Sequence, residues 1–393
     1  MSARGRLRPV AVIGTGIVSF GKFPDLSVPH LARPAVMEAM KESGLARSDI
    51  QSLYCGSALS GMMAGQRIAR ETGLSGIPIV NNENACSSGA TAFREALIAV
   101  GSGVIDHALV VGVEKLSRLG GGTLPLDRED IEATNGLVMP GLYAMRAQRY
   151  LHDHGHTVRD LAAVAVKSRR HGALTPYAQF RTLTSLEEVL ASRPIADPLT
   201  LLQCCPTGDG AAAVVIGPAN GVPAGSRAPV RVMASHLASG RYVSGFRDMT
   251  VPEITVRCAG ELYEAASLDP RDLDVIECHD AFTIAELLYY EALGLCGRGE
   301  APRLLHDGVT SLGGRQVVNP SGGMLSKGHP VGASGVAQIV EIVRQLQGRC
   351  EARQVAGARI GLTHVTGGGT SGFDHGACCI HAFSSELEGG TVA

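Results

Sequence analysis

The sequence has no tryptophan, and aromatic residues make up only 4% of its 393 residues. Glycine is abundant instead, with 50 residues, and 45% of the chain is hydrophobic. A core with so few rings must be filled by small aliphatic side chains that pack closely. The chain is long enough to bury a large core and more than one domain-sized unit. This composition is typical of a layered α/β enzyme.

An excess of charge of either sign is also missing, since the formal net charge is −2 and lysine and arginine are scattered. We therefore expect no nucleic-acid or anionic-lipid partner. No apolar run reaches about 18 residues, so no membrane span is expected. Residues 1–14 include basic side chains, but their apolar stretch has only the length of one strand. A signal peptide needs a longer apolar region, so none is expected.

The ten cysteines contain no C-x-x-C pair. Cys204–Cys205 and Cys378–Cys379 are adjacent pairs, which are badly placed to form tetrahedral metal sites. We predict no metal, reduced thiols and a cytoplasmic protein. Residues 388–393 carry no peroxisomal Ser-Lys-Leu address. Gly14 and Gly16 are followed by Ser19 where a dinucleotide fingerprint has its third glycine, so NAD binding is not expected either.

Expected strands and helices alternate along the chain and divide it into two halves. In the first half we expect strands at 8–16, 50–56, 107–113 and 210–217, with helices at 30–43, 64–72 and from Cys86 onward. In the second half we expect strands at 229–238, 273–277, 359–365 and 376–383, with helices at 251–266, 283–293 and 328–346.

The two halves also resemble each other in short stretches. Residues 49–59 resemble residues 272–282, including a cysteine at the strand end, and residues 84–97 resemble residues 327–340. Such a repeat predicts two βαβ-type halves whose strand ends converge on one site. We expect an N-terminal half at 1–225 and a C-terminal half at 226–393.

A long insertion at about 117–205, rich in helix formers and basic residues, interrupts the first half. Excursions of this length from an α/β unit are usually functional, as lids or flaps. Its basic side chains are candidates for a polyphosphate ligand: Arg146, Arg149, Lys167, Arg169, Arg170 and Arg181. The alternative for any single one of them is a solvated helix face.

Cys86 lies in a run of small residues, 81–100, at the start of an expected helix. Asn84 and the Ser87–Ser88 pair can cap that helix, and Gly89 lets another backbone approach closely. A cysteine in the first helical turn faces unpaired N–H groups and the positive end of the dipole, which lowers its pKa. We therefore predict a nucleophilic thiolate; the alternative is a packed structural cysteine.

Two histidines stand where a strand or loop passes into a helix: His279 in segment 277–287 and His329 in segment 319–341. A thiol together with two histidines supplies the nucleophile and the proton-transfer groups that covalent acyl transfer requires. The loop at 363–372 is rich in glycine, so its N–H groups can approach an oxyanion.

At these residues the chain resembles the thiolase superfamily, and its sterol-carrier-protein-type, acetyl-CoA-acetyltransferase-like branch in particular. The matching motifs are ENACSSGA around Cys86, His-Asp-x-Phe at 279–282 and Gly-His-Pro at 328–330, and the resemblance runs along essentially the whole chain. It implies two pseudo-duplicated βαβαβαββ halves in five αβαβα layers, with a loop insertion. It also implies acyl-CoA and CoA as substrates without a tightly bound cofactor, a place in lipid metabolism, and a homodimer or dimer of dimers.

The same resemblance implies roles by position. Cys86 would carry the acyl group, and His329 would activate it and help form a first oxyanion hole. His279 would hold a water or the thioester oxygen there. The N–H groups of Cys86 and Gly367 would form a second hole, and Phe282 is a candidate for substrate contact.

One departure from the family pattern stands out. Thiolases place a second cysteine, which moves the α-proton, in a Cys-x-Gly motif of the last loop, where this chain has Val365. Some sterol-carrier-type enzymes place it third in His-Asp-Cys-Phe, where this chain has Ala281. We therefore expect His279, His329 or His364 to handle the α-proton, or the reaction to need no such step.

The leading hypothesis is an enzyme that cleaves a 3-ketoacyl-CoA with CoA or runs the reverse Claisen condensation. Alternatives are a carbon-acyltransferase acting on a non-CoA acceptor such as an aromatic ring, and a catalytically weak acyl-CoA-binding subunit. A retro-aldolase of the same fold is disfavoured, because such members of the family lack the nucleophilic cysteine. The branch also implies a small companion protein with an oligonucleotide-fold and a zinc-ribbon domain.

Overall fold

The computed structural model describes residues 7–120, 122–127, 129–223, 225–369 and 374–387. Ten strands form its central sheet. Five come from the first half of the chain: β1 (Val10–Ile17), β2 (Ser52–Gly56), β3 (Ile79–Asn82), β4 (Ala108–Lys115) and β7 (Asp209–Pro218). Five come from the second half: β8 (Val230–Ser239), β9 (Val275–Glu277), β10 (Val317–Val318), β11 (Ile360–Gly367) and β12 (Ala377–Ser384).

The two sets of strands repeat one topology. Their orders are β3-β2-β4-β7-β1 and β10-β9-β11-β12-β8. In each set the first three strands are parallel and the last two join antiparallel. A short antiparallel pairing between β1 and β8 joins the sets into one sheet. The repeated order agrees with the internal repeat in the sequence; the short strands β3 and β10 were not expected.

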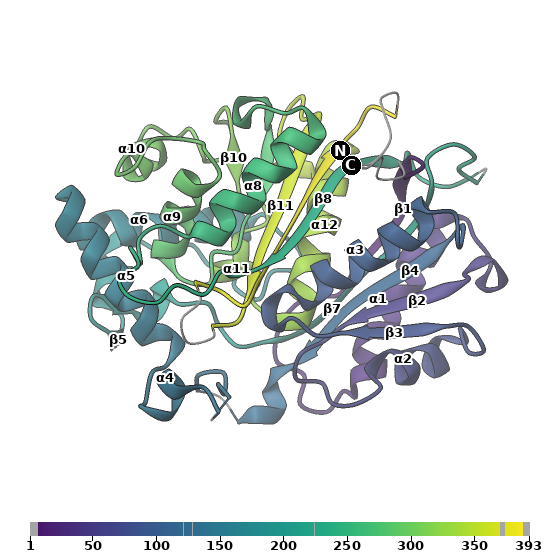
Figure 1. The fold of residues 1–393 in the computed structure, drawn as a ribbon, viewed down its shortest axis with the longest axis horizontal. Coiled ribbons are helices and arrows are strands. Elements are labelled where there is room, and N and C mark those ends of the chain that lie inside the picture. Colours follow the sequence, from purple (N-terminus) through teal and green to yellow (C-terminus); the bar gives the residue numbers. More distant parts are fainter. Residues whose placement is uncertain (1–6, 121, 128, 224, 370–373, 388–393) are drawn as a thin grey trace.

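Helices form layers on both faces of the sheet (Figure 1). On the first half, α1 (Val28–Ser43) covers β1, β4 and β7, and α2 (Ala64–Thr72) covers β2 and β3. On the second half, α8 (Glu253–Ala266) covers β8 and β12 and packs on α9 (Thr283–Ala292). Between the two sets, α3 (Ser88–Gly101) packs against α12 (Val331–Leu346) and contacts strands of both halves, as α12 does. The sequence of layers is therefore α, β, α, β, α.

Small residues allow α3 and α12 to come together. A Cβ on Gly89 would lie 2.5 Å from the carbonyl oxygen of Gly332, and one on Gly335 would lie 2.7 Å from the backbone nitrogen of Ala90. Neither position has room for a side chain without moving a backbone. Glycine is thus required at these two positions of the central layer, because its two helices meet at backbone distance.

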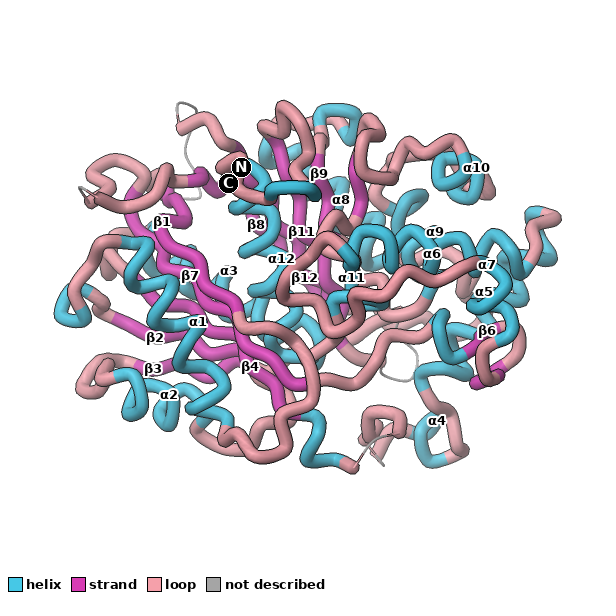
Figure 2. Tube along the Cα trace, turned by 180° about the vertical axis from the view of Figure 1, so that it is seen from behind, coloured by secondary structure: helices cyan, strands magenta, loops and turns pink. Residues whose placement is uncertain are grey.

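The insertion folds beside the second half of the chain, although it leaves the sheet from the first (Figures 1 and 2). It contains α4 (Ile131–Thr134), α5 (Met139–His154), α6 (Val158–Ala173), α7 (Leu186–Ala191) and the small hairpin β5 (Pro194–Ala196) and β6 (Leu199–Thr200). α5 packs on α9, and α6 packs on α9, on α10 (Ala301–His306) and on α11 (Gly323–Lys327). Among the described residues, no helix has the length and hydropathy needed to cross a membrane.

Candidate active site

Cys86 lies in a short 3-10 turn, Ala85–Ser87, directly before α3. Ala85 has a left-handed φ of 48°, which costs a non-glycine residue about 1–2 kcal/mol. The hydroxyl of Ser88 holds the turn by donating to the Ala85 carbonyl and accepting from the Asn84 N–H. The predicted helix cap is wrong: neither Asn84 nor Ser87 caps through its side chain, and the Asn84 amide donates to Thr91 instead.

His329 stands two residues before the start of α12 and contacts Cys86. Its Nε2 lies 3.3 Å from the Cys86 Sγ, and its Nδ1 lies 2.8 Å from the Ser334 Oγ. The Ser334 hydroxyl donates to the carbonyl of Pro330, so its oxygen is left to accept from Nδ1–H. This arrangement fixes the tautomer, and Nε2 is therefore the nitrogen that can accept the thiol proton.

The charge state of the pair differs from the sequence prediction. Burial raises the pKa of the Cys86 thiol to about 12, and a hydrogen bond from the Gly368 N–H offsets this only in part. Burial, with a smaller contribution from Lys327, lowers the pKa of His329 to about 4. The predicted resting thiolate is wrong, because desolvation outweighs the short helix dipole here. Both groups are neutral at pH 7, and thiol deprotonation must accompany attack on the substrate.

His279 follows β9 and completes the cluster. Its ring centroid lies 5.2 Å from that of His329, and one donor atom each of Cys86, His279 and His329 lie within 4.8 Å of one another. Its Nδ1 lies 2.7 Å from the Thr366 Oγ1, whereas its buried Nε2 has no hydrogen-bond partner within the described parts of the chain. Burial and the neighbouring histidines hold the pKa of His279 well below its usual range.

These three side chains have the donor atoms and spacing that a zinc ion would accept. The 3.3 Å contact between Sγ and Nε2 also has the geometry of a thiol donating to a base. Since the second nitrogen of His329 is fixed by a serine hydroxyl rather than by a carboxylate or carbonyl, we interpret the cluster as a nucleophile with its base.

Gly367 ends β11 against the nucleophile turn. A Cβ there would clash with the carbonyl of Asn84, so only glycine lets the strand end approach this closely. The next residue, Gly368, donates its N–H to the Cys86 sulfur. The glycine-rich loop thus supplies one backbone donor, the Gly368 N–H, beside the nucleophile. Residues 370–372 of that loop lie outside the described residues.

No thiol occupies the two positions at which the family places its second cysteine. Val365 is buried in a small apolar cluster that packs against Cys86. Ala281 accepts a backbone hydrogen bond from Cys205, which interacts electrostatically with Cys86 and was not singled out from the sequence. Burial raises the pKa of the Cys205 thiol well above its usual value. Cys278 lies apart from the nucleophile, with its sulfur on the side chain of Asn319.

The structure argues against phosphate binding by two of the basic residues of the insertion. Arg146 is buried and its Nη2 lies 2.6 Å from the Asp374 Oδ1. Lys167 is buried and its Nζ lies 2.6 Å from the Glu286 Oε1. Their charges are neutralised inside the protein, because a buried charge needs a partner. Arg146 lies on the buried face of α5 and Lys167 on the buried face of α6, and neither face was recognised in the sequence.

The other tentative residues separate into two groups. Arg149, Arg170 and Arg181 are exposed, Arg149 in an ion pair with Asp153, and all three charges remain accessible to a ligand. Arg169 is buried with its guanidinium 4.3 Å from the Phe180 ring centroid.

Phe282 is buried and stacks on Tyr143 with 4.4 Å between ring centroids. His364 is buried in β11, where its Nε2 lies 3.0 Å from the Thr255 Oγ1. Burial, together with His375, lowers its pKa to about 3. Neither residue belongs to the cluster of Cys86, His279 and His329.

Sequence reasoning missed a buried polar network behind His279. Thr366 links His279 to Tyr289, whose hydroxyl lies 3.1 Å from the Thr366 Oγ1. Tyr143 and His375 continue the network, with 3.0 Å between the Tyr143 hydroxyl and the His375 Nε2. Nothing in the spacing of these residues indicates their meeting, since they come from α5, α9, β11 and the segment before β12.

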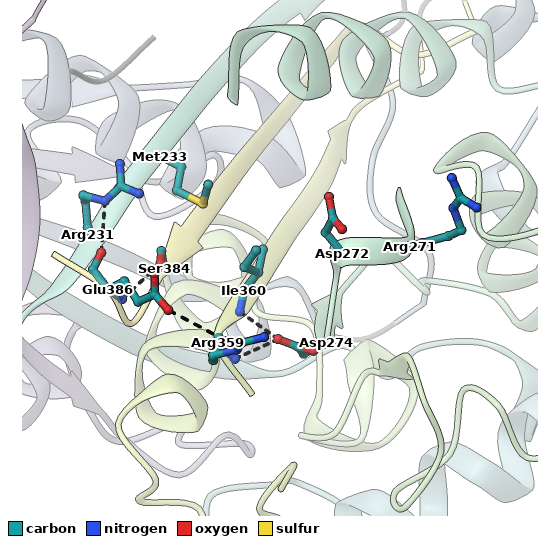
Figure 3. A pocket seen from close by; sticks show the side chains of 9 residues that line it. All are labelled: Arg231, Met233, Arg271, Asp272, Asp274, Arg359, Ile360, Ser384 and Glu386. Carbon is teal, nitrogen blue, oxygen red and sulfur yellow. Dashed lines mark hydrogen bonds and ion pairs between the residues drawn. The ribbon is translucent and has the colours of Figure 1, made fainter. Parts of the chain in front are cut away.

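A pocket of about 430 Å³ lies elsewhere, at the opposite end of the same strands (Figure 3). It is lined by the start of β8 and β11 and the end of β12, through Arg231, Ile360 and Ser384. Its arginines are paired: Arg359 with Glu386, and Arg271 with Asp269. None of the three clustered side chains lines it.

Comparison with known families decides the identity of the fold. Residues 10–220 match the thiolase N-terminal domain, and residues 235–374 match the thiolase C-terminal domain-like family. The chain belongs to the thiolase family. The family and the α/β thiolase fold predicted from the motifs are therefore confirmed.

Relatives of this thiolase-family chain include a thiolase subunit and a sterol carrier protein. It is 45% identical over 368 residues to the benzoylsuccinyl-CoA thiolase subunit BbsB of Thauera aromatica, covering 92% of this chain and 95% of that one. It is 37% identical to sterol carrier protein 2 of Gallus gallus, covering 92% of this chain and 70% of that protein. A solved Ltp2–ChsH2(DUF35) aldolase superposes with a TM-score of 0.81 at 26% identity, covering 97% and 99% of the two chains. The chain is a thiolase-type acyltransferase that uses acyl-CoA substrates.

Proposed function

We propose that Cys86 carries the acyl group as a thioester and that His329 is its base. The observation that carries this proposal is the 3.3 Å contact between the Cys86 Sγ and the one His329 nitrogen left free to accept a proton. A neutral thiol beside a neutral imidazole is the starting point for general-base activation of a nucleophile. Cys86 is largely buried but partly exposed, and this exposure gives a substrate access to its sulfur.

In the thiolysis direction, the thiol proton passes to the His329 Nε2 as sulfur attacks the 3-keto carbon. The N–H groups of Cys86 and Gly367 stabilise the oxyanion. The bond between C2 and C3 then breaks, leaving acyl-Cys86 and the enolate of a shorter acyl-CoA, whose thioester oxygen faces His279 and His329. Protonation at C2 releases that product. CoA then attacks acyl-Cys86, and the reverse sequence is a Claisen condensation.

The substrate proposal rests on similarity. Because the chain is 45% identical to a benzoylsuccinyl-CoA thiolase subunit, we include 3-ketoacyl-CoAs with an aryl ketone or a second carboxylate among its candidate substrates. Arg149, Arg170 and Arg181 are the exposed residues of the predicted set, and they remain available for the CoA phosphates.

The proposed assembly is a homodimer or dimer of dimers in the cytoplasm, with a small oligonucleotide-fold and zinc-ribbon companion. The unpaired edge of β3, with Val80 exposed, supports self-association. One relative is named as a subunit and one structural neighbour as a two-protein complex, which supports a companion. The division into halves at 1–225 and 226–393 also remains a proposal.

The test is thiolysis of a panel of 3-ketoacyl-CoAs, with acetoacetyl-CoA, a long straight-chain substrate and benzoylsuccinyl-CoA as members. We expect CoA-dependent cleavage of at least one member, and loss of that cleavage in Cys86→Ala. Acylation of Cys86 without cleavage of any member would favour a carbon-acyltransferase that uses another acceptor. Neither acylation nor cleavage, in the presence of acyl-CoA binding, would overturn the proposal in favour of a catalytically weak subunit.

A further inference from the structure

The buried network behind His279 comprises five side chains. The His279 Nδ1 lies 2.7 Å from the Thr366 Oγ1, which lies 3.1 Å from the Tyr289 hydroxyl. Tyr289 interacts with the Tyr143 hydroxyl, which partly offsets the rise that burial causes in the pKa of Tyr143, and the Tyr143 hydroxyl lies 3.0 Å from the His375 Nε2. All five residues are at most 4% exposed, so the chain of hydrogen bonds is screened from solvent.

A buried carboxylate stands at the far end of this network. The His375 Nδ1 lies 3.4 Å from the Asp374 Oδ2, and the Asp374 Oδ1 accepts a hydrogen bond from Arg146 at 2.6 Å. Burial alone would raise the pKa of Asp374, but His375 and Arg146 hold it well below its usual range. The carboxylate is therefore ionised, and it can stabilise a proton on His375 through charge attraction.

At the end of the network nearest to Cys86, one nitrogen of His279 is free to accept a proton. The Nε2 of His279 is buried and has no hydrogen-bond partner within the described chain. A buried polar atom without a partner is costly and calls for an explanation. This nitrogen belongs to the ring that stands 5.2 Å from the His329 ring, in the cluster that contains the nucleophile.

We propose that the network of His279, Thr366, Tyr289, Tyr143 and His375 is a proton relay that replaces the missing second cysteine. This inference rests on the proposed function. His279 is the catalytic residue of the relay because its Nε2 takes the α-proton; the other four are positioning residues that act through it.

The proton count of the relay balances. At the start, His279 donates from Nδ1 to Thr366, and each hydroxyl donates to the next, ending at the His375 Nε2. When the C2–H bond of the acceptor acyl-CoA breaks, its proton binds the His279 Nε2 and its electron pair stays on C2. Each proton along the relay moves by one bond, and His375 becomes an imidazolium beside Asp374.

The carbanion at C2 then attacks acyl-Cys86, a C–C bond forms and the C–S bond to Cys86 breaks. The stored proton returns through the relay, and His329 passes it to the Cys86 thiolate. Thiolysis runs the same transfers in reverse: the Cys86 thiol proton passes through His329 into the relay, and the relay protonates C2 of the departing enolate. When CoA then attacks acyl-Cys86, the CoA thiol proton passes through His329 to the Cys86 thiolate. No thiol other than Cys86 and CoA takes part.

The test compares two rates in each variant: acylation of Cys86 by acyl-CoA, and exchange of the α-hydrogens of an acyl-CoA with D₂O. Thr366→Val removes the linking hydroxyl at constant shape, and Thr366→Ser restores it. We expect Thr366→Val to lower exchange relative to acylation by about 10²-fold or more, and Thr366→Ser to recover most of it. Tyr289→Phe, which removes the next hydroxyl, should lower the same ratio.

Tyr290→Phe is the matched control. Tyr290 is the next residue on α9 and equally buried, but its hydroxyl contacts Glu286 and Thr310 outside the relay. Its ratio of exchange to acylation should stay at the wild-type value. An unchanged ratio in both Thr366→Val and Tyr289→Phe, with folding confirmed by circular dichroism, would overturn the relay while leaving acyl-Cys86 intact. Absence of acylation in the wild type would instead overturn the proposed function.

Discussion

Ser334 fixes the tautomer of the proposed base, and its removal gives a prediction of defined size. In Ser334→Ala the Nδ1–H of His329 loses its acceptor, while Nε2 still faces the Cys86 sulfur at 3.3 Å. A hydrogen bond to a neutral group contributes about 0.5–1.5 kcal/mol, and one to a charged group about 1.5–3 kcal/mol. His329 is neutral at rest and becomes charged as it takes the thiol proton, so the bond strengthens during the reaction.

The difference of about 1–1.5 kcal/mol predicts a fall of roughly 5- to 12-fold in the rate of Cys86 acylation, since about 1.4 kcal/mol is a factor of ten. The assay is single-turnover acylation by acetyl-CoA, followed by intact mass. Ser168→Ala is the control, because that serine is equally buried but its hydroxyl has no partner within the described chain. An acylation rate in Ser334→Ala equal to that of Ser168→Ala would refute the tautomer assignment.

Three further predictions concern charge. Because the resting Cys86 is a thiol with a pKa raised to about 12, the rate of its alkylation by iodoacetamide should rise with pH throughout the range 7 to 9. A plateau of the alkylation rate below pH 8 would contradict a neutral Cys86 beside a neutral His329. In the same pair, His329→Ala should slow acylation of Cys86 by about 10²–10⁴-fold. Reversing the charge of both Arg149 and Arg170 should raise the KM for CoA, and more strongly at low salt. Reversing the charge of Arg271, which lines the distant pocket, should leave this KM unchanged. Equal KM values in the wild type, the double variant and the Arg271 variant would exclude binding of CoA by Arg149 and Arg170. Burial and Lys167 lower the pKa of His171 from 6.5 to about 3, so as the pH falls the unfolded state binds a proton at this residue before the folded state does. The contribution of His171 to the free energy of unfolding is therefore complete above pH 6.5 and decreases by roughly 5 kcal/mol toward pH 3. Chemical denaturation at several pH values should show that His171→Gln reduces the slope of the unfolding free energy against pH by about 1.4 kcal/mol per pH unit near pH 5.

Much of the fold follows from local patterns in the sequence. Short apolar runs bounded by glycine predict the long strands, and the ends of β1, β7 and β12 lie within two residues of the predicted ones. The repeated stretches at 49–59 and 272–282 correspond to β2 and β9, which occupy the same place in the two strand orders. The two-residue strand β10 carries no such pattern, because its pairing depends on neighbours distant in the sequence.

The catalytic cluster was accessible from the sequence for a physical reason. Cys86, His279 and His329 each stand at a junction between a strand or loop and a helix, and the ends of parallel strands meet at one edge of a sheet. Charge states were not accessible in the same way, since they depend on burial. The helix dipole favours a thiolate at Cys86, but desolvation is the larger effect and appears only when the chain is folded.

Tertiary pairing also decides the fate of the basic residues. Arg146 and Lys167 look like phosphate ligands in the sequence, yet their partners, Asp374 and Glu286, lie 228 and 119 positions further along the chain. The same holds for the polar network behind His279, whose members come from four separate segments. A single sequence offers no spacing rule for such contacts.

The central claim is that Cys86 carries the acyl group with His329 as its base. The most direct measurement is peptide mapping of the protein quenched within one turnover of a labelled acyl-CoA, in the wild type, in Cys86→Ala and in His329→Ala. We predict one acylated peptide, containing Cys86, in the wild type, none in Cys86→Ala, and much slower labelling of the same peptide in His329→Ala. Labelling of Cys205 or another residue at the wild-type rate in Cys86→Ala would contradict the account.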